Sequence, residues 1–329
     1  MMELLRDLVS IYGPSGREEL VADFIIEQIK DYVDEVQKDA LGNVIAMKKG
    51  KGSKKVMLAA HMDQIGIMVT FIDENGFLRF SNIGGLNPYS LLYKRVIFKN
   101  GVEGIISKEQ KADIKELTLK ELYIDIGAST REEASQKVQI GDFGVFKSDF
   151  QDFGDRVVGA AFDDRLGCYV LLEVAKQIKD SENDIYFVFT TQEEVGLRGA
   201  KVSAFRIEPD LAIAVDVTAT GDTPNCNKMA VKLGEGAAIK IMDRAFIVHP
   251  KVKDLLVRVA EENNVKYQFE ILEMGTTDAA EIFTTKTGVP TGVISIPTRY
   301  IHSHSEMADK RDIKAAIDIL KYLVPNNLD

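Results

Sequence analysis

The hydrophobic positions of this chain follow two different patterns, and the pattern changes twice along its length. Towards both ends, continuous apolar runs alternate with segments whose apolar residues recur at helical spacing. Such an alternation is typical of an α/β fold with a mostly parallel sheet that is covered by helices on both faces. We expect buried strands at VMLAA (56–60), IYFVF (185–189), LAIAV (211–215) and VISIP (293–297).

Helical spacing predicts the elements that cover this sheet. The first residues form an amphipathic segment, and an apolar stripe between residues 20 and 29 predicts a second helix. Ser15 and Glu18 have the spacing of a capping box in front of that second helix. Further helices are predicted over 163–178, 249–264 and 310–324.

The segment from about 70 to 155 has a different pattern. Short alternating runs separated by turn residues dominate it, with one helical candidate over 129–137. Short strands at regular spacing predict an inserted small β-barrel domain over 70–155. The surrounding α/β domain is then discontinuous, made of residues 1–69 and 156–329. The alternating runs are FLRFSNI, KRVIFKN, GVEGIIS, ELYIDIG and DFGVFKS.

Composition narrows the class of protein. The chain is 45% hydrophobic and 28% charged, and its net charge of −10 argues against nucleic acid as a partner. Its two cysteines, Cys168 and Cys226, cannot form a disulfide framework, which fits a cytoplasmic setting. No run approaches the ~18 apolar residues of a membrane span, and charges interrupt the apolar N-terminal segment. We therefore expect a cytoplasmic globular protein with no membrane partner.

The residues that follow the predicted strands are rich in metal-binding side chains. In sheets of this kind, ligand sites gather beyond the carboxyl ends of the strands. His61 and Asp63 follow the first run, and residues two apart point to the same side of an extended chain. His61 could bind a metal ion while Asp63 holds its other ring nitrogen. The alternative is a histidine and an aspartate that merely solvate a strand end.

Adjacent carboxylates occur at the end of the second run, where Glu193 and Glu194 follow IYFVF. Like charges this close repel and raise each other's pKa, and a bound cation would make the pair tolerable. Asp216 follows the third run, and Asp163 and Asp164 open a predicted helix, where an ordinary helix cap is the alternative.

Three of the chain's four histidines, His61, His302 and His304, lie just past strand ends. The fourth, His249, precedes Pro250 at a predicted helix start, and we interpret it as structural. Imidazole and carboxylate side chains without thiolates favour zinc, cobalt or manganese.

The order and spacing of several segments resemble the tetrahedral aminopeptidases, a family of peptidases with two metal ions at one site. Some members of that family were described as cellulases or endoglucanases. The resemblance covers essentially the whole chain, with the β insert between the first two ligand segments. The segments that carry it are YGPSGREE, AAHMDQIG, IGGL (83–86), VGAAFDDRLGC, TTQEEVGLRGA, AVDVTATGDTP and PTRYIHS.

The resemblance implies roles for particular residues of this chain. Asp163 is implied to bridge the two metal ions, and Asp63 to orient His61. Glu193 is implied to be the general base. Two ions are implied for each subunit, zinc or cobalt above all and manganese as a further possibility. The implied metal ligands are His61, Asp163, Glu194, Asp216 and His302.

The resemblance also implies an activity and an assembly. The activity is removal of N-terminal residues from short peptides. The assembly is a tetrahedral homododecamer built from dimers, with the 70–155 domain carrying the dimer contacts. The chain departs from the family pattern at Gln64, where an acidic residue is common, and over MGTTDA (274–279). Asp278 and His304 are therefore given no role.

Three rival functions stay open at this stage. An amide deacylase could use the same scaffold and the same metal ions. A glycoside hydrolase would use two carboxyl groups about 5–9.5 Å apart and would need no metal ion. A non-catalytic interaction protein could use the β insert alone, although all of the implied ligands are present. The sequence names neither the preferred N-terminal residue of the substrate nor the native metal.

Overall fold

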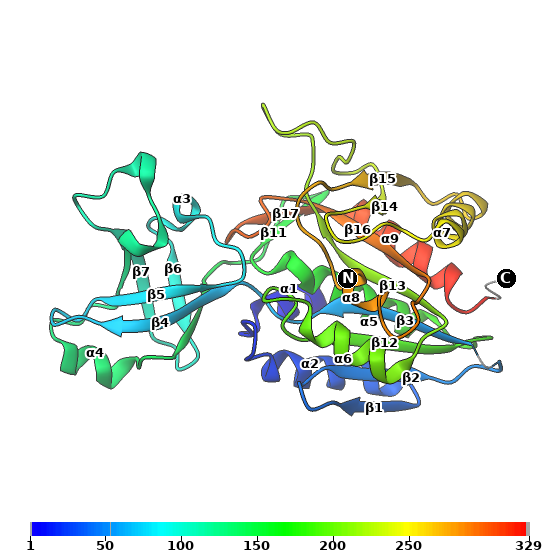
Figure 1. The fold of residues 1–329 in the computed structure, drawn as a ribbon, viewed down its shortest axis with the longest axis horizontal. Coiled ribbons are helices and arrows are strands. Elements are labelled where there is room, and N and C mark those ends of the chain that lie inside the picture. Colours follow the sequence, from blue (N-terminus) through cyan, green and yellow to red (C-terminus); the bar gives the residue numbers. More distant parts are fainter. Residues whose placement is uncertain (1, 53, 327–329) are drawn as a thin grey trace.

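A large α/β body and a smaller barrel that projects from one side of it make up the molecule in the computed structural model (Figure 1). The structure describes residues 2–52 and 54–326. The predicted α/β fold with an inserted β-barrel is confirmed. None of the described helices combines the length and the apolar character that a membrane span requires.

Four parallel strands form the centre of the large sheet, in the order β12–β3–β13–β16. Each contains one of the continuous apolar runs, because a strand buried on both faces has no position for a solvated polar side chain. Their carboxyl ends therefore meet at one edge of the sheet. The strands are β3 (Lys55–His61), β12 (Asp184–Thr190), β13 (Leu211–Thr218) and β16 (Thr291–Arg299).

The strands that flank this centre pair antiparallel to it on both sides. On one side β2 joins β12 and carries β1; on the other, β16 pairs with both β14 and β17. Only β14 and β15 repeat the parallel arrangement there. The flanking strands are β1 (Glu35–Lys38), β2 (Val44–Lys48), β10 (Gln151–Asp152), β11 (Arg156–Gly159), β14 (Ala237–Met242), β15 (Tyr267–Ile271) and β17 (Glu306–Asp309).

Helices cover both faces of the sheet, and alternate residues of each strand point to different layers. Val56 and Leu58 of β3 pack in the core beneath α5, whereas Met57 and Ala59 pack with α6. The first layer holds α1 (Glu3–Ser10), α2 (Glu19–Ile29), α5 (Phe162–Gln177), α7 (Pro250–Glu262) and α9 (Lys310–Leu323). The second layer holds α6 (Arg198–Ile207) and α8 (Ala279–Ile282).

Six strands close the barrel in the order β4–β5–β8–β7–β6–β9 around a hydrophobic core of its own. They are β4 (Gly66–Ile72), β5 (Leu78–Ile83), β6 (Arg95–Phe98), β7 (Glu103–Lys108), β8 (Leu122–Asp125) and β9 (Phe143–Phe146). The predicted helix of this region is α4 (Arg131–Lys137), capped by Thr130, and α3 (Pro88–Leu91) is a single turn. Three 3₁₀ turns complete the described elements: Lys30–Tyr32, Ile114–Glu116 and Leu119–Glu121.

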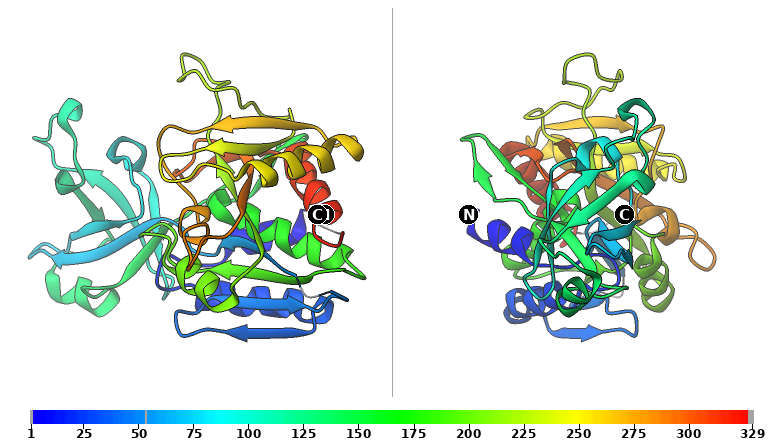
Figure 2. Two further views of the ribbon diagram at one scale, coloured as in Figure 1. Left: turned by 45° about the vertical axis from the view of Figure 1, so that its right-hand side comes forward. Right: turned by 90° about the vertical axis from the view of Figure 1, so that its left-hand side faces the viewer.

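The two rotated views in Figure 2 show the loop between β13 and β14 extending away from the α/β body. Its base is held by Arg299, whose guanidinium donates to both carboxylate oxygens of Asp222 at 2.9 and 2.7 Å. The barrel strands run from residue 66 to residue 146. The division into a discontinuous domain of residues 1–69 and 156–329 and an inserted domain of residues 70–155 stays a prediction.

Candidate metal centre

The carboxyl ends of the four central strands bring together all seven residues that the sequence singled out. His61 is the last residue of β3, and Asp216 lies near the end of β13. Glu193 and Glu194 lie in the loop after β12, and His302 lies in the turn after β16. Asp163 comes from the opposite direction, at the start of α5. Asp63, two residues beyond β3, is fully buried behind the two glutamates.

Asp163 lies between the two histidines and faces each with a different oxygen. Its Oδ1 is 3.0 Å from Nε2 of His61, and its Oδ2 is 3.1 Å from Nε2 of His302. Glu194 approaches the same His302 nitrogen, with Oε1 at 3.2 Å. Asp216 stands on the other side, 3.9 Å from Nε2 of His61. The carboxylate of Asp163 thus has the two-sided position that a bridging ligand needs.

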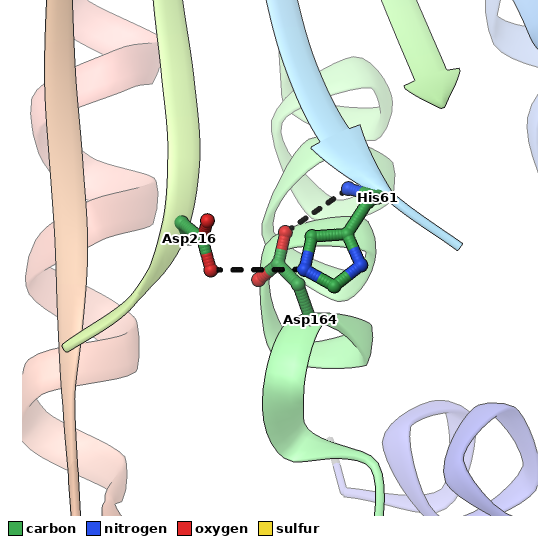
Figure 3. A group of neighbouring side chains, drawn as sticks. All are labelled: His61, Asp164 and Asp216. Atoms are coloured by element: carbon green, nitrogen blue, oxygen red, sulfur yellow. Dashed lines mark hydrogen bonds and ion pairs between the residues drawn. The ribbon is translucent and has the colours of Figure 1, made fainter. Parts of the chain in front are cut away.

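The donor atoms form two groups, and within each the atoms lie within 4.8 Å of one another. One group is Asp163, Glu194 and His302. The other, drawn in Figure 3, is His61, Asp164 and Asp216, contributed by β3, α5 and β13.

Asp164 is a member that the sequence prediction did not include. Its Oδ2 accepts a hydrogen bond from the backbone N–H of His61 at 3.2 Å, and its Oδ1 accepts from Gly167 at 2.9 Å. A Cβ on Gly167 would lie 2.4 Å from Asp164 Oδ2, so only glycine allows this approach. The peptide bond between Asp163 and Asp164 is cis, and the regular α conformation of α5 begins after these two residues.

The chemistry of these donors fits divalent metal ions. Imidazole nitrogens and carboxylate oxygens are the ligands that zinc, cobalt and manganese accept. Oε1 of Glu194 is buried and forms no hydrogen bond among the described residues, although Nε2 of His302 lies 3.2 Å away. A buried carboxylate oxygen without a donor is costly unless a cation balances it. The residues present could therefore hold metal ions.

Burial and mutual repulsion shape the protonation of the site. Burial raises the pKa of Glu193 well above its ordinary value, and the carboxylates of Asp216 and Glu194 add to this effect. Burial alone would lower the pKa of His61, but the nearby carboxylates of Glu193 and Asp163 outweigh it and raise that pKa. A carboxylate with a raised pKa is a stronger base, which suits proton transfer near neutral pH.

Asp63 supports the site from behind rather than lining it. Its Oδ1 accepts from the backbone N–H of Glu193 at 3.0 Å, and its Oδ2 accepts from that of Glu194 at 3.2 Å. Its backbone carbonyl lies 3.1 Å from Nδ1 of His61, and the closer carboxylate oxygen lies at 3.5 Å. Asp63 therefore orients three site residues at once, whereas the sequence pattern suggested only the histidine.

The capping box predicted at Ser15 and Glu18 is wrong. Glu18 itself occupies the N-cap position of α2, and no side chain caps that helix. The Ser15 hydroxyl instead donates to Asp63 Oδ2 at 2.6 Å. Oε1 of Glu18 accepts from the backbone N–H of Gly16 and from that of Gln192, directly before the paired glutamates. Both side chains are used to support the site, which spacing along the chain cannot reveal.

The loop that follows β5 of the barrel comes close to the site at Gly84 and Gly85. A Cβ on Gly84 would lie 2.8 Å from Oε2 of Glu194, and a Cβ on Gly85 would lie 2.8 Å from Nδ1 of His302. A larger residue at either position would displace one of these two site residues. The segment after β5 therefore belongs to the wall of the site.

A cavity of about 460 Å³ opens beside the metal-binding groups. Asp163, Glu193, Glu194, Asp216 and His302 lie on one side of it. The other side is largely apolar and includes Leu197, Val217, Leu272, Met274 and Ile301. The one cation on the described wall is Lys240, which is buried and paired with Asp243 at 3.3 Å and Glu270 at 3.1 Å.

Two further acids belong to the site and were not predicted. Glu306 accepts from the backbone N–H groups of His302 and Asp163. Burial raises the pKa of Glu306 to about 8, the Asp163 carboxylate adds to this, and the two amide hydrogen bonds oppose it. Asp278 accepts from the Thr190 hydroxyl at 2.5 Å, and burial raises its pKa to about 6.

His304 takes no part in the ion pairs that the structure describes between site residues, whereas His302 takes part in two. His249 stands at the N-cap of α7 directly before Pro250, so the predicted helix start is confirmed, and the structural role of His249 stays a prediction.

Comparison with known proteins places this geometry in context. A family model described as M42 glutamyl aminopeptidase matches residues 42–319. A protein of Acetivibrio thermocellus named a putative aminopeptidase is 54% identical over 97% of this chain and 97% of its own length. The structure of an aminopeptidase from Desulfurococcus kamchatkensis superimposes with a TM-score of 0.95 at 42% identity, covering 98% of this chain and 94% of that one.

A third similar protein is the Pyrococcus horikoshii TET1 peptidase, whose structure is described as assembling into a tetrahedron or a large octahedral shell. It superimposes with a TM-score of 0.90 at 33% identity, and 99% of each chain is covered.

Proposed function

Because the chain belongs to the M42 glutamyl aminopeptidase family and is a peptidase, we propose that it removes N-terminal residues from short peptides with two divalent metal ions and Glu193 as the general base. The observation that carries the proposal is the position of Asp163 between the imidazoles of His61 and His302. No ordinary structural role needs one buried carboxylate to face two histidines from strand ends that are distant in the sequence.

We assign the ligands as two sets that share Asp163. His61 and Asp216 complete the first set, and Glu194 and His302 complete the second. Asp164 is the alternative to Asp163 in the first set, but both of its oxygens already accept backbone N–H groups. Zinc and cobalt suit these ligands best, and manganese is also possible.

The reaction needs a water that loses a proton and a carbonyl that accepts charge. When bound, two divalent ions supply the acidity of a shared water and polarise the scissile carbonyl. Glu193 lines the cavity and lies outside both donor groups, so its carboxylate is free to take the proton of that water. The same carboxyl can then pass the proton to the leaving amine.

Exopeptidase action follows from the confined position of the site. The donor groups sit on one side of a cavity of about 460 Å³, beside a mostly apolar wall that can receive the side chain of the first residue. When bound, one of the two metal ions could also hold the free amine of the substrate's first residue. A peptide would therefore bind with its N-terminal residue in the cavity and its remainder outside.

For the assembly, we propose a homododecamer built from dimers, in which the barrel carries much of the dimer contact. The tetrahedron described for the Pyrococcus horikoshii peptidase supports this assembly. Exposed apolar side chains on the barrel, among them Tyr93 and Ile105, support a contact there. A cytoplasmic location and the lack of nucleic-acid or membrane partners stay predictions.

A chelator experiment on chromogenic substrates tests the proposed function. The protein is stripped of metal, and zinc, cobalt and manganese are added back separately before a panel of aminoacyl substrates is assayed. We expect activity to disappear on stripping and to return with at least one metal. An N-acetylated copy of the best substrate is the control, and it should not be cleaved because its amine is blocked.

Two outcomes would contradict the proposal. Hydrolysis of a cello-oligosaccharide that survives complete metal removal would favour a metal-independent glycoside hydrolase. Equal cleavage of the free and the N-acetylated substrates would exclude exopeptidase action and favour an amide deacylase.

A further inference from the structure

We propose that Glu306 is a positioning residue that holds Asp163 and His302 in place, so that one of the two metal ions depends on it far more than the other. The inference rests on the proposed two-metal function. Glu306 does not line the cavity and is not among the donor groups, so it acts through the backbone of the ligands.

The contacts of Glu306 are specific to two ligands. Glu306 is the first residue of β17, and its side chain is 1% exposed. Its Oε1 accepts from the backbone N–H of His302 at 2.9 Å, and its Oε2 accepts from that of Asp163 at 3.2 Å. One carboxylate therefore joins the turn after β16 to the first turn of α5.

These two ligands need such support because neither lies in a regular element. His302 has φ of 60°, in the left-handed region that residues other than glycine rarely adopt. Asp163 has non-helical dihedral angles, φ −76° and ψ 106°, at the start of α5. No sheet or helix pattern fixes their amide groups, so the carboxylate of Glu306 does.

Glu194, which belongs to the same donor group as Asp163 and His302, is supported in the same way. The backbone N–H of Glu194 donates to Oδ2 of Asp63, which is itself buried. All three residues of the group formed by Asp163, Glu194 and His302 thus donate their main-chain N–H to a buried carboxylate.

In the other donor group, the central sheet also holds two of the three members. His61 is paired with Thr190 in the parallel ladder of β3 and β12, and Asp216 is paired with Ser295 in that of β13 and β16. The central sheet therefore fixes these two ligands without help from Glu306. Asp163 is shared by both ligand sets, whereas His302 belongs only to the second, so a change at Glu306 should weaken the ion held by Glu194 and His302 more than the ion held by His61 and Asp216.

The test is metal binding by the Glu306→Gln variant. Glutamine can accept from one amide with its carbonyl oxygen, but its NH₂ group faces the other amide, so one hydrogen bond is lost. Changing a residue that orients a metal ligand typically weakens metal binding by about 10–100-fold. We expect the wild type to bind two cobalt ions, and the variant to bind the ion of Glu194 and His302 about 10–100-fold more weakly, with a clearly smaller loss for the other ion.

The chain offers a matched control in Asp312. This buried aspartate also accepts two backbone N–H groups, from Gly234 and Gly236 at 2.7 Å each, and neither glycine lines the cavity. Asp312→Asn should lower the stability of the fold and leave both cobalt affinities unchanged. A general loss of stability would instead weaken metal binding in both variants.

Cobalt absorption spectra identify which ion is affected. His302→Ala and His61→Ala each remove one ligand from one donor group. The spectrum of the ion that remains tightly bound in Glu306→Gln should match that of His302→Ala and differ from that of His61→Ala. Excess cobalt should restore the spectrum of the doubly loaded protein to Glu306→Gln.

Several outcomes would overturn the inference. They are wild-type affinity for both ions in Glu306→Gln, equal weakening of both ions, or the spectrum expected of His61→Ala. If Glu306→Gln does not fold, Glu306→Asp decides, because it keeps both oxygens but is too short to reach both amides. Wild-type binding of both ions by Glu306→Asp would then refute the role. If the wild type binds no divalent ion, the two-metal function fails as well.

Discussion

At the scale of single residues, the paired glutamates after β12 are assigned two different tasks. Oε1 of Glu194 lies 3.2 Å from Nε2 of His302, within the group of donor atoms. Glu193 lies outside both groups, with Oε2 3.9 Å from Nε2 of His61. Asp63 holds the backbone amides of both, and adjacent residues present their side chains in different directions. One carboxylate can thus serve a metal ion while its neighbour stays free for a proton.

This division predicts opposite defects for two isosteric variants. Glu193→Gln should retain both metal ions but lose turnover by about 10²–10⁴-fold, because an amide cannot accept the proton. Glu194→Gln should bind metal more weakly and recover part of its activity at high metal concentration. Metal content by mass spectrometry, measured beside kcat for each variant, checks both expectations. Metal loss in Glu193→Gln with full metal content in Glu194→Gln would reverse the assignment.

At the scale of elements, helix α9 is tied to the loop before β14 through one buried carboxylate. Asp312 lies in the first turn of α9 and accepts from the backbone N–H groups of Gly234 and Gly236. Burial raises the pKa of Asp312 to about 7, although these hydrogen bonds oppose the shift. The folded state therefore binds a proton more tightly at this residue than the unfolded chain does.

The raised pKa of Asp312 predicts a pH-dependent contribution to stability. Between the unfolded value near 4 and the folded value near 7, the folded state keeps a proton that the unfolded chain has lost. The free energy of unfolding should therefore fall as pH rises through this window, by at most about 1.4 kcal/mol per pH unit. Urea unfolding of the metal-free wild type and of Asp312→Asn at pH 5 and pH 8 measures this contribution.

The stability difference between wild type and Asp312→Asn should be larger at pH 5 than at pH 8, because asparagine does not titrate. Metal is left out because metal binding depends on pH and would stabilise the folded state to different extents at the two pH values. A difference that stayed constant, or grew with pH, would show that Asp312 is not held in its protonated form.

At the scale of the whole molecule, the barrel projects from the α/β body (Figure 1). Several of its large apolar side chains are exposed to solvent. Tyr93 is 70% exposed, Ile140 is 64% exposed and Ile105 is 50% exposed. Scattered apolar residues are common on surfaces, but several on one small projecting unit favour a contact with another subunit. The backbone N–H of Tyr93 donates to the carbonyl of Ile106, so Tyr93 and Ile105 lie on neighbouring parts of the barrel.

This arrangement predicts that charges on the barrel disrupt the assembly. In the Tyr93→Asp/Ile105→Asp double variant, the two new aspartates would be buried without a partner in the proposed dimer contact. The particle mass should therefore fall below that of a dodecamer. Light scattering at the assay concentration measures this. Lys99→Glu, at an exposed barrel residue, is the control and should keep the wild-type mass. An unchanged mass in the double variant would place the subunit contacts elsewhere.

Much of the fold follows from local patterns in the chain. The four central strands are continuous apolar runs because the sheet buries both of their faces. Every residue of such a run must therefore carry an apolar side chain. The insert is recognisable because the hydrophobic period changes from that of helices to that of strands. The antiparallel flanks were not predicted, since pairing direction depends on connections and not on composition.

The candidate site, like the fold, could be predicted in part. His61, Asp163, Glu193, Glu194, Asp216 and His302 could be named as candidates because they lie at the ends of apolar runs or open a helix, and parallel strands end at one edge of a sheet. Their separate roles came from the resemblance to the tetrahedral aminopeptidases.

The tertiary structure alone decided the supporting residues. Ser15 and Glu18 have the spacing of a capping box, yet they bind Asp63 and the backbone before Glu193. Glu306 reaches the amides of Asp163 and His302 only because β17 folds back beside β16. Whether a side chain can support a ligand depends on which backbone amides folding brings near it. No pattern along the chain encodes that proximity.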